Sequence, residues 1–168
     1  AESMQDESAK QALLNAHNRI TSMLVLYDKL YKNENTNEID MALYLSSLVE
    51  EITNTFPIGI GIQEDLDSIL IPVKVASSIG IIVNELITNS CKYGFNETRE
   101  NVITIGLKKN LKKVVLTIAD NGTGFNIDES AAGFGMNLVS TLISQIKGKH
   151  TIKNKDGIIH TISFSLLQ

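Results

Sequence analysis

Cysteine and long apolar runs are both scarce in this chain. Its 168 residues contain a single cysteine, Cys91, which excludes an internal disulfide framework and fits a reducing compartment. No stretch approaches the ~18 uninterrupted apolar residues of a membrane-spanning helix, and no secretory signal is visible at the start of the sequence. We therefore expect a cytoplasmic location and no membrane segment in this chain.

Runs of basic residues are also lacking. No run exceeds a few residues and the net charge is −4, so we expect no nucleic-acid partner. The hydrophobic fraction of 43% is sufficient for a core. The length predicts one ordinary domain, or one domain with a helical appendage.

One helical segment combines a polar stripe with apolar surroundings. In the run Asn84-Glu85-Leu86-Ile87-Thr88-Asn89-Ser90-Cys91-Lys92-Tyr93, Glu85, Asn89 and Lys92 are spaced so that a helix places them on one face. The rest of this helix is apolar at Val75, Ile79, Ile81, Ile82, Val83, Leu86 and Ile87. Because buried polar groups need partners, the stripe predicts a bound magnesium–nucleotide complex. Carboxylate and amide oxygens suit Mg²⁺, and a lysine offsets phosphate charge.

A second segment follows a strand-like run at residues 114–119. Asp120 ends that run, so its carboxylate is expected to project from the strand end and accept a hydrogen bond from an exocyclic amine such as that of adenine. Gly122 and Gly124 allow positive φ and close approach to a flat ring.

A third segment, Gly133-Phe134-Gly135-Met136, opens a helical pattern that runs to Ile146. Glycines at the start of a helix expose backbone N–H groups to bound phosphates. Each glycine pair alone is a common turn signal, whereas the ordered set of three segments is far more specific.

In this order the segments resemble the ATP-binding domain shared by sensor histidine kinases, DNA gyrase, the mismatch-repair MutL proteins and the heat-shock ninety chaperones. Glu85, Asn89 and Lys92 are similar to its N box, residues 120–124 to its first glycine box and residues 133–136 to its second. Within this family, residues 82–89 are most similar to bacterial histidine kinases with a compact catalytic domain.

The N-terminal stretch resembles the second helix of the dimerisation and phosphotransfer hairpin of those kinases, on the strength of Asn18-Arg19-Ile20-Thr21-Ser22-Met23 and Tyr27-Asp28-Lys29-Leu30-Tyr31. The resemblance implies a partial dimerisation and phosphotransfer helix at residues 1–35 and an ATP-binding catalytic domain at residues 36–168. It further implies a homodimer in the full-length protein.

The activity implied by the resemblance is that of an ATP-dependent protein histidine kinase, a phosphotransferase of two-component signal transduction in bacteria. Such a phosphoprotein would use ATP and Mg²⁺, release ADP and pass its phosphate to a response regulator. Glu85 and Asn89 are the implied catalytic and metal-binding residues. The implied ATP contacts are Glu85, Asn89, Lys92, Tyr93, Asp120, Gly122, Gly124, Gly133, Phe134, Gly135 and Met136.

Two features depart from the family pattern. Gly157 is followed by Ile158 where the family often has threonine, which leaves one adenine-side contact open. The segment at residues 125–132 is short and has no lysine or arginine, so it cannot form a long lid with its own cation.

The three histidines differ from a phosphate-accepting histidine in their setting. His17 lies on an apolar seam and lacks an adjacent acid that could act as general base. In the resembling family the acceptor is on the preceding helix, which this chain is expected not to contain. His150 and His160 lie in predicted strands without companions at zinc-ligand spacing. Cys91 is expected to be a small helix residue rather than a reactive thiol.

The N-terminal helix is predicted over residues 5–32, with its seam at Leu13, His17, Ile20, Leu24, Tyr27 and Tyr31. A second helix begins near Asp40, a plausible N-cap, and carries an apolar stripe at Met41, Leu45, Leu48, Ile52 and Phe56. The seam can pack on this stripe, on the α/β domain or on a second copy of the chain.

The remaining pattern predicts the fold class. Strands are expected at residues 58–62 and 69–71, a helix from Pro72, and a helix at residues 136–147. Hairpins are expected at residues 102–109 with 112–119 and at residues 150–154 with 158–166. This order indicates an α/β (α+β) two-layer sandwich of helices and a mixed, mostly antiparallel sheet, preceded by the long N-terminal helix, with the nucleotide between the layers.

Two other classes of function fit the same motifs. In an ATP hydrolase of the gyrase or MutL type, Glu85 would activate water, although such proteins usually add a transducer domain and longer lids. An anti-sigma-factor serine kinase is a related possibility, but that type lacks the N-terminal seam helix. A non-catalytic, dimeric nucleotide-binding adaptor would retain the N box without transferring phosphate.

Overall fold

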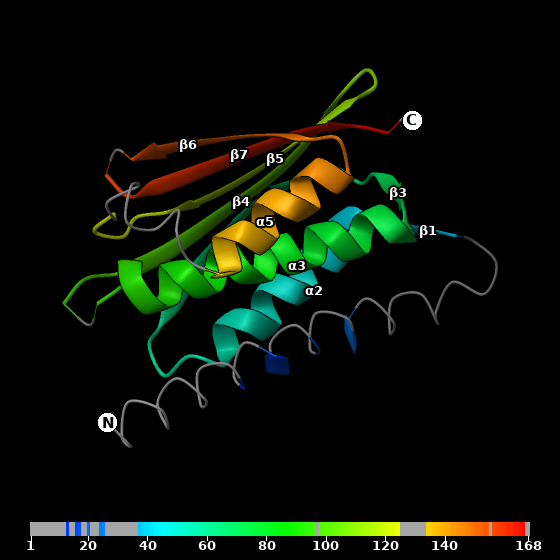
Figure 1. Ribbon diagram of the computed structural model, residues 1–168. Coiled ribbons are helices and arrows are strands. Elements are labelled where there is room, and N and C mark those ends of the chain that lie inside the picture. The colour runs from blue at the N-terminus through cyan, green and yellow to red at the C-terminus, as the bar shows by residue number, and fades with distance from the viewer. Residues whose placement is uncertain are drawn as a thin grey trace.

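The computed structural model describes residues 37–96, 98–124, 134–154 and 156–166, together with the helical positions Leu13, Ala16, His17, Ile20, Leu24 and Val25. Within these residues a five-stranded sheet forms one layer and the helices α2, α3 and α5 cover one of its faces (Figure 1). No helix among them is long and apolar enough to cross a membrane.

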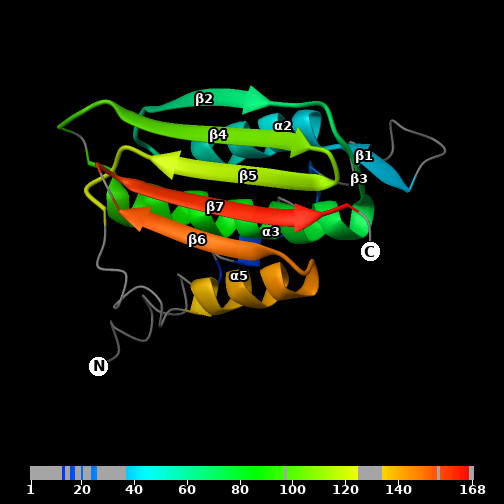
Figure 2. The ribbon, with the colours of Figure 1, turned by 90° about the horizontal axis from the view of Figure 1, so that it is seen from above.

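The sheet is mixed and mostly antiparallel. Its strands follow the order β2 (Ile60–Leu66), β4 (Asn101–Asn110), β5 (Lys113–Asp120), β7 (Ile158–Ser165) and β6 (Lys149–Asn154), as Figure 2 shows. Only β2 and β4 pair in parallel. Strand β5 therefore lies in the middle of the sheet, with Lys113 at one of its ends and Asp120 at the other.

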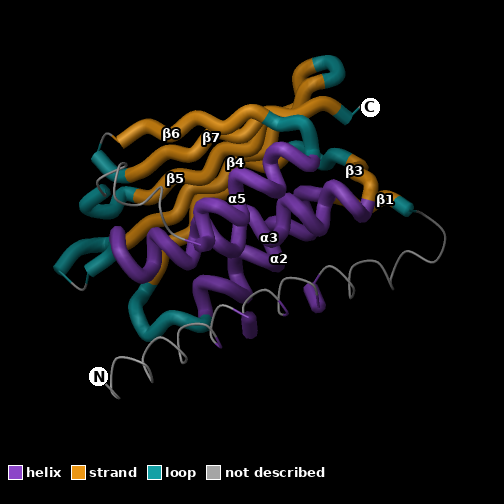
Figure 3. The backbone as a smooth tube through the Cα atoms, viewed as in Figure 1, coloured by secondary structure: helices purple, strands orange, loops and turns teal. Residues whose placement is uncertain are grey.

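Three helices and one π-helical turn make up the second layer (Figure 3). They are α2 (Met41–Asn54), α3 (Val73–Asn89), the π-helix η1 (Ser90–Gly94) and α5 (Phe134–Gln145). The carboxylate of Asp40 accepts hydrogen bonds from the amides of Ala42 and Leu43, so the predicted N-cap of α2 is confirmed. Helix α3 continues directly into η1, which lies beside the end of β5.

The core lies between the layers. The apolar stripe of α2, Met41, Leu45, Leu48 and Ile52, is buried there. A side chain at Gly80 of α3 would collide with the hydroxyl of Tyr44, so a glycine is what lets α2 and α3 approach each other closely. Burial raises the pKa of Tyr44 well above its usual value, which keeps the phenol neutral in the core.

The expected elements agree with the structure within a few residues, with three corrections. The first hairpin turns at Leu111 and Lys112, one residue later than expected. The strand expected at residue 58 begins at Ile60. The strand expected at residues 69–71 is β3 (Leu70–Pro72), and it pairs with a strand that the sequence did not predict, β1 (Glu38–Asp40). A strand of three residues that ends at the N-cap of a helix is too short for an alternating pattern to stand out.

The described seam residues Leu13, Ile20 and Leu24 do not pack on α2. Leu13, Ile20 and Leu24 are 72%, 57% and 62% exposed, whereas Val25 is partly buried against the domain core. Tyr27 and Tyr31 lie outside the described residues. Since the stripe of α2 is already buried in the domain, the described part of the seam faces outward.

Candidate functional site

The carboxylate of Asp120, at the end of β5, is held by three hydrogen bonds. The hydroxyl of Ser90 donates to Oδ2 at 2.6 Å, while the amides of Gly122 and Ile158 donate to Oδ1 at 2.8 and 3.3 Å. A carboxylate offers about four acceptor positions, so one remains for an external donor. The 8% exposure of Asp120 means that this acceptor is both fixed and largely shielded from water.

The backbone around Asp120 is crowded enough to require glycine. A Cβ at Gly122 would lie 2.7 Å from Asp120 Oδ1 and 2.8 Å from the carbonyl oxygen of Gly94. The amide of Thr123 donates to that same carbonyl at 3.0 Å. The loop after β5 is thus attached to η1, and this close contact explains the glycine at position 122. The positive φ expected at Gly122 is wrong, because Gly124 and Gly157 are the described glycines with positive φ, and the close approach of Gly122 to a flat ring stays a prediction. Gly124 has φ +72°, the positive φ expected there.

The polar stripe of α3, which includes Glu85 and Asn89, lies next to the first turn of α5. Glu85 is 6% exposed, and a Cβ at Gly135 would lie 2.6 Å from Glu85 Oε2. One turn further along α3, the amide nitrogen of Asn89 lies 3.9 Å from the sulfur of Met136. The N-box residues and the start of α5 therefore form one local cluster.

The donor set of this cluster fits a magnesium ion bound together with phosphates. Glu85 offers carboxylate oxygens and Asn89 an amide oxygen on the same helix face, both of which are hard oxygen ligands. A site with so few protein ligands suits Mg²⁺, which usually keeps several waters and shares phosphate oxygens. Gly133 lies outside the described residues, while Phe134 is exposed at the start of α5.

Burial shifts the pKa values of Lys92 and Cys91, which lie next to this cluster, in opposite directions. Burial lowers the pKa of the Lys92 ammonium group, and the nearby Glu85 carboxylate opposes that shift. Burial, reinforced by the negative charge of Asp120, raises the pKa of the Cys91 thiol to about 12. Cys91 is therefore a neutral, buried thiol, in agreement with the packing role expected from the sequence. Tyr93, the last residue expected at the site, is 67% exposed on η1.

Two neighbours of the expected site residues have structural roles. Ser90 lies off the polar stripe, so no helical spacing could reveal its bond to Asp120. Asn121 accepts a hydrogen bond from the amide of Val102 and donates one to the carbonyl of Glu100. Its side chain therefore joins the loop after β5 to β4.

A histidine pair lies on the same sheet face as Asp120. Nε2 of His150 and Nδ1 of His160 are 3.0 Å apart, and the two rings are stacked. Burial lowers the pKa of His160 to about 4; the neighbouring His150 adds to this shift and Asp120 opposes it. Burial also lowers the pKa of His150. The sequence did not predict this contact, because the two residues are on different strands.

Two family models match the chain. Residues 61–159 match the model described as histidine kinase-like ATPase domain, and residues 1–56 match one described as histidine kinase. A curated relative, the sensor histidine kinase PdtaS of Mycolicibacterium smegmatis, is 21% identical over an alignment of 156 residues that covers 83% of this chain. The chain spans only 29% of that relative's length.

The fold is also that of solved histidine kinase domains. The histidine kinase domain of the blue-light activated histidine kinase EL346 from Erythrobacter litoralis superposes with a TM-score of 0.82 at 20% identity, over 98% of this chain and 83% of that one. The mycobacterial sensor histidine kinase MprB gives a TM-score of 0.64 at 15% identity, over 76% and 95% of the two chains.

Proposed function

Because the chain belongs to the histidine kinase-like ATPase domain family, we propose that it is the ATP-binding catalytic part of a two-component sensor histidine kinase. It binds Mg-ATP and transfers the γ-phosphate to a histidine on a dimerisation hairpin. The observation that carries this proposal is the Asp120 carboxylate, which three hydrogen bonds hold with one acceptor position to spare.

In the proposed complex, Asp120 accepts a hydrogen bond from the exocyclic amine of adenine. Guanine presents a carbonyl at the corresponding position, which cannot donate, so the fixed carboxylate selects the base. Gly122 and Gly124 keep side chains away from the ring, and Tyr93 and Phe134 supply exposed aromatic surface beside it.

At the other end of the nucleotide, Glu85 and Asn89 hold Mg²⁺, and Lys92 offsets phosphate charge. The backbone of residues 133–136 provides N–H groups for the phosphates at the start of α5. When bound, the metal ion would neutralise the negative charge that develops on the phosphates. Phosphoryl transfer depends mainly on positioning and charge stabilisation. In this proposal the side chains of α3 and η1 and the backbone at the start of α5 act by positioning the phosphates.

The accepting group in this proposal is a neutral imidazole. Its unprotonated ring nitrogen is already nucleophilic near neutral pH, so the chain needs no strong base beside the γ-phosphate. Residues 1–35 belong to the dimerisation and phosphotransfer part and residues 36–168 to the catalytic part. The full-length protein acts as a homodimer and passes its phosphate to a response regulator.

The test is a phosphotransfer assay with three readouts. The chain is incubated with γ-labelled Mg-ATP, with and without a separately purified dimerisation hairpin that carries an acceptor histidine. Acid-labile label on the hairpin is the expected result. Rapid phosphate release without acceptor would instead favour the hydrolase, and tight binding without transfer or release would favour the adaptor. Label mapped to His17 would overturn the expectation that His17 is not the acceptor.

A further inference from the structure

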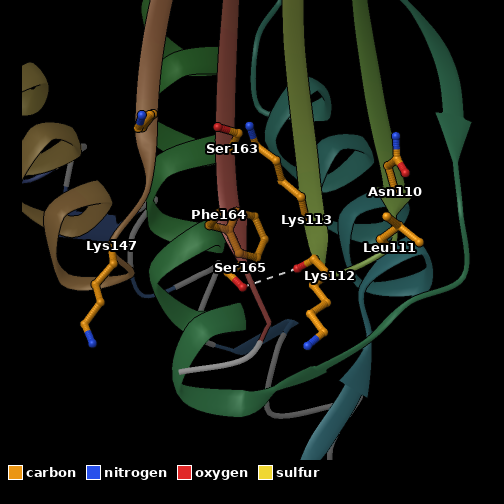
Figure 4. A pocket seen from close by; sticks show the side chains of 9 residues that line it. Asn110, Leu111, Lys112, Lys113, Lys147, Ser163, Phe164 and Ser165 are labelled. Carbon is orange, nitrogen blue, oxygen red and sulfur yellow. Dashed lines mark hydrogen bonds between the residues drawn. The ribbon is translucent and has the colours of Figure 1, made fainter.

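A basic hollow of about 520 Å³ lies at the end of the sheet opposite Asp120. It is lined by four lysines and no acidic residue, with the protruding β4–β5 hairpin on one side (Figures 3 and 4). The lining residues are Asn110, Leu111, Lys112, Lys113, Lys147, Lys149, Ser163, Phe164 and Ser165. The proposed phosphotransfer uses none of them.

The strand register places two of the lysines on one face with serines between them. Lys113 of β5 pairs with Ser165 of β7, and Ser163 of β7 pairs with Lys149 of β6. Paired residues share a face of the sheet, and alternate positions of β7 do so as well, so all four side chains point to the side away from the helices. Two strand spacings and an offset of two residues along β7 separate Lys113 from Lys149 by about 12 Å.

The positive charge of the hollow is not neutralised by the described chain. None of its four lysines forms an ion pair with another described residue. Lys108, on the next strand of the same sheet, shows the contrast, because it forms ion pairs with both Asp65 and Asp67. In a chain with a net charge of −4, four lysines that line one hollow without an ion pair to a described residue favour an anionic partner.

Backbone strain is concentrated around the same hollow. Three described non-glycine residues have positive φ, and two of them line it: Leu111 at 54° and Lys147 at 51°. Lys147 follows α5 at the position where the amide of Gly148 bonds back to the carbonyl of Ile143, a site that usually carries glycine. Lysine keeps its side chain at the hollow in a backbone conformation that glycine adopts more easily.

We propose that the basic hollow is a docking site for an acidic segment of a partner protein. An extended chain advances about 3.3 Å per residue and places alternate side chains on one face, so carboxylates four residues apart share a face and match the separation of Lys113 and Lys149. Leu111, 88% exposed at the hairpin tip, offers apolar contact that a free phosphate ion cannot use. Docking leaves the nucleotide site free, because Asp120 lies at the other end of β5, seven residues or about 23 Å from Lys113.

Other anions fit these observations less well. The hollow has no arginine and no exposed aromatic ring among its lining residues, and these are the groups that stack on nucleic-acid bases. Its concave shape does not suit a flat lipid surface. Lysines also protect sheet edges from pairing with other chains, which accounts for Lys149 on the edge strand β6 but not for Lys113 on the interior strand β5.

The proposal is tested by fluorescence anisotropy with the full 168-residue chain at about 50 mM salt, where charge attraction is weakly screened. The probe is a fluorescein-labelled peptide of about ten residues, with glutamate at every fourth position and two leucines at positions between the glutamates. Saturable binding in the micromolar range is expected, unaffected by saturating Mg-ATP. The double variant Lys113→Glu/Lys149→Glu is expected to weaken it at least about tenfold, while Lys113→Arg/Lys149→Arg retains it.

Two controls keep the result specific. Lys153→Glu reverses one lysine on β6 outside the hollow, against two in the double variant, and is expected to change affinity less than about twofold. Vesicles containing phosphatidylserine are expected to show no binding that depends on Lys113 and Lys149. The proposal fails if the peptide does not bind, if Lys153→Glu weakens binding as much as the double variant does, or if vesicles bind with the same lysine dependence. None of these readouts requires phosphotransfer, so the proposed kinase activity is tested separately.

Discussion

The hydroxyl of Ser90 lies 2.6 Å from Oδ2 of Asp120 and joins the end of α3 to the end of β5. This hydrogen bond connects the element that carries Glu85 and Asn89 to the residue proposed to recognise adenine. The two halves of the proposed nucleotide site are thus held in register by a buried contact between side chains thirty positions apart.

The first prediction follows from that contact. Asp120→Asn replaces one carboxylate oxygen with a donor, so ATP affinity should fall at least about tenfold and the preference for ATP over GTP should disappear. Ser90→Ala leaves the carboxylate in place but removes one of its hydrogen bonds. ATP affinity should then fall about fivefold, which is equivalent to about 1 kcal/mol for one hydrogen bond. Titration calorimetry with both nucleotides measures these effects. Ser144→Ala, on the exposed side of α5, should change neither the ATP affinity nor the preference for ATP over GTP. An Asp120→Asn protein with unchanged base preference would contradict the proposal that Asp120 recognises adenine.

The second prediction concerns the metal. Asn89→Ala removes an oxygen ligand of the proposed Mg²⁺ site, so the gain in ATP affinity on adding Mg²⁺ should shrink by about tenfold. The measurement compares ATP titrations with excess Mg²⁺ and with a chelator. Asn54→Ala removes an exposed amide at the end of α2 and should leave the magnesium effect intact. Equal magnesium dependence in Asn89→Ala and wild type would exclude Asn89 as a ligand.

The third prediction uses the contact between Gly135 and Glu85. A Cβ at position 135 would lie 2.6 Å from Glu85 Oε2, so Gly135→Ala must displace the carboxylate or the start of α5. Nucleotide affinity should fall about tenfold, while thermal stability changes little, since alanine favours a helix over glycine. The matched control is Gly59→Ala, where no atom lies within 4 Å of the added Cβ. Full affinity in Gly135→Ala would show that the position of Glu85 does not matter for binding.

The fourth prediction concerns acid stability. His160 has a pKa lowered to about 4 in the fold and an ordinary pKa of about 6.5 when unfolded. Between these values the unfolded chain binds the extra proton, so the free energy of unfolding rises with pH across that window and falls on acidification. The full effect is about 3 kcal/mol, and His150, whose pKa is also lowered, acts in the same direction.

Urea unfolding at several pH values from about 4.5 to 7.5 measures this dependence. His160→Phe keeps a ring on β7 but cannot titrate, so its stability should vary less with pH. His17→Ala, at an exposed helical position, should retain the wild-type slope. If wild type and His160→Phe lose stability equally on acidification, the histidine pair is not its cause.

The fifth prediction concerns assembly through the N-terminal helix. Leu13, Ile20 and Leu24 present an apolar face to solvent, and contiguous apolar surface tends to mark an interface. A concentration-dependent dimer is therefore expected in analytical ultracentrifugation. Leu24→Glu should dissociate it without weakening ATP binding. A strict monomer at all micromolar concentrations would refute the dimer, and a loss of ATP binding in the variant would place the seam against the catalytic domain.

Much of this protein could be predicted from local patterns alone. The helical spacing of Glu85 and Asn89, the turn that follows Asp120 and the cap at Asp40 each depend on residues within about one turn of one another. The identity of the helices and most strands follows from the same short-range periodicity. The family resemblance has this local character too, because its motifs are short and ordered along the chain.

The tertiary structure decided the contacts between residues that are distant in the sequence. The restraint of Asp120 by Ser90 and Ile158, the stacking of His150 on His160 and the convergence of four lysines at the far end of the sheet all depend on which strands are neighbours. The stripe of α2 was excluded as the partner of the apolar seam only when it was found buried in the core. Side-chain periodicity specifies which face of an element is buried, but the choice of its neighbour depends on the packing of the whole chain.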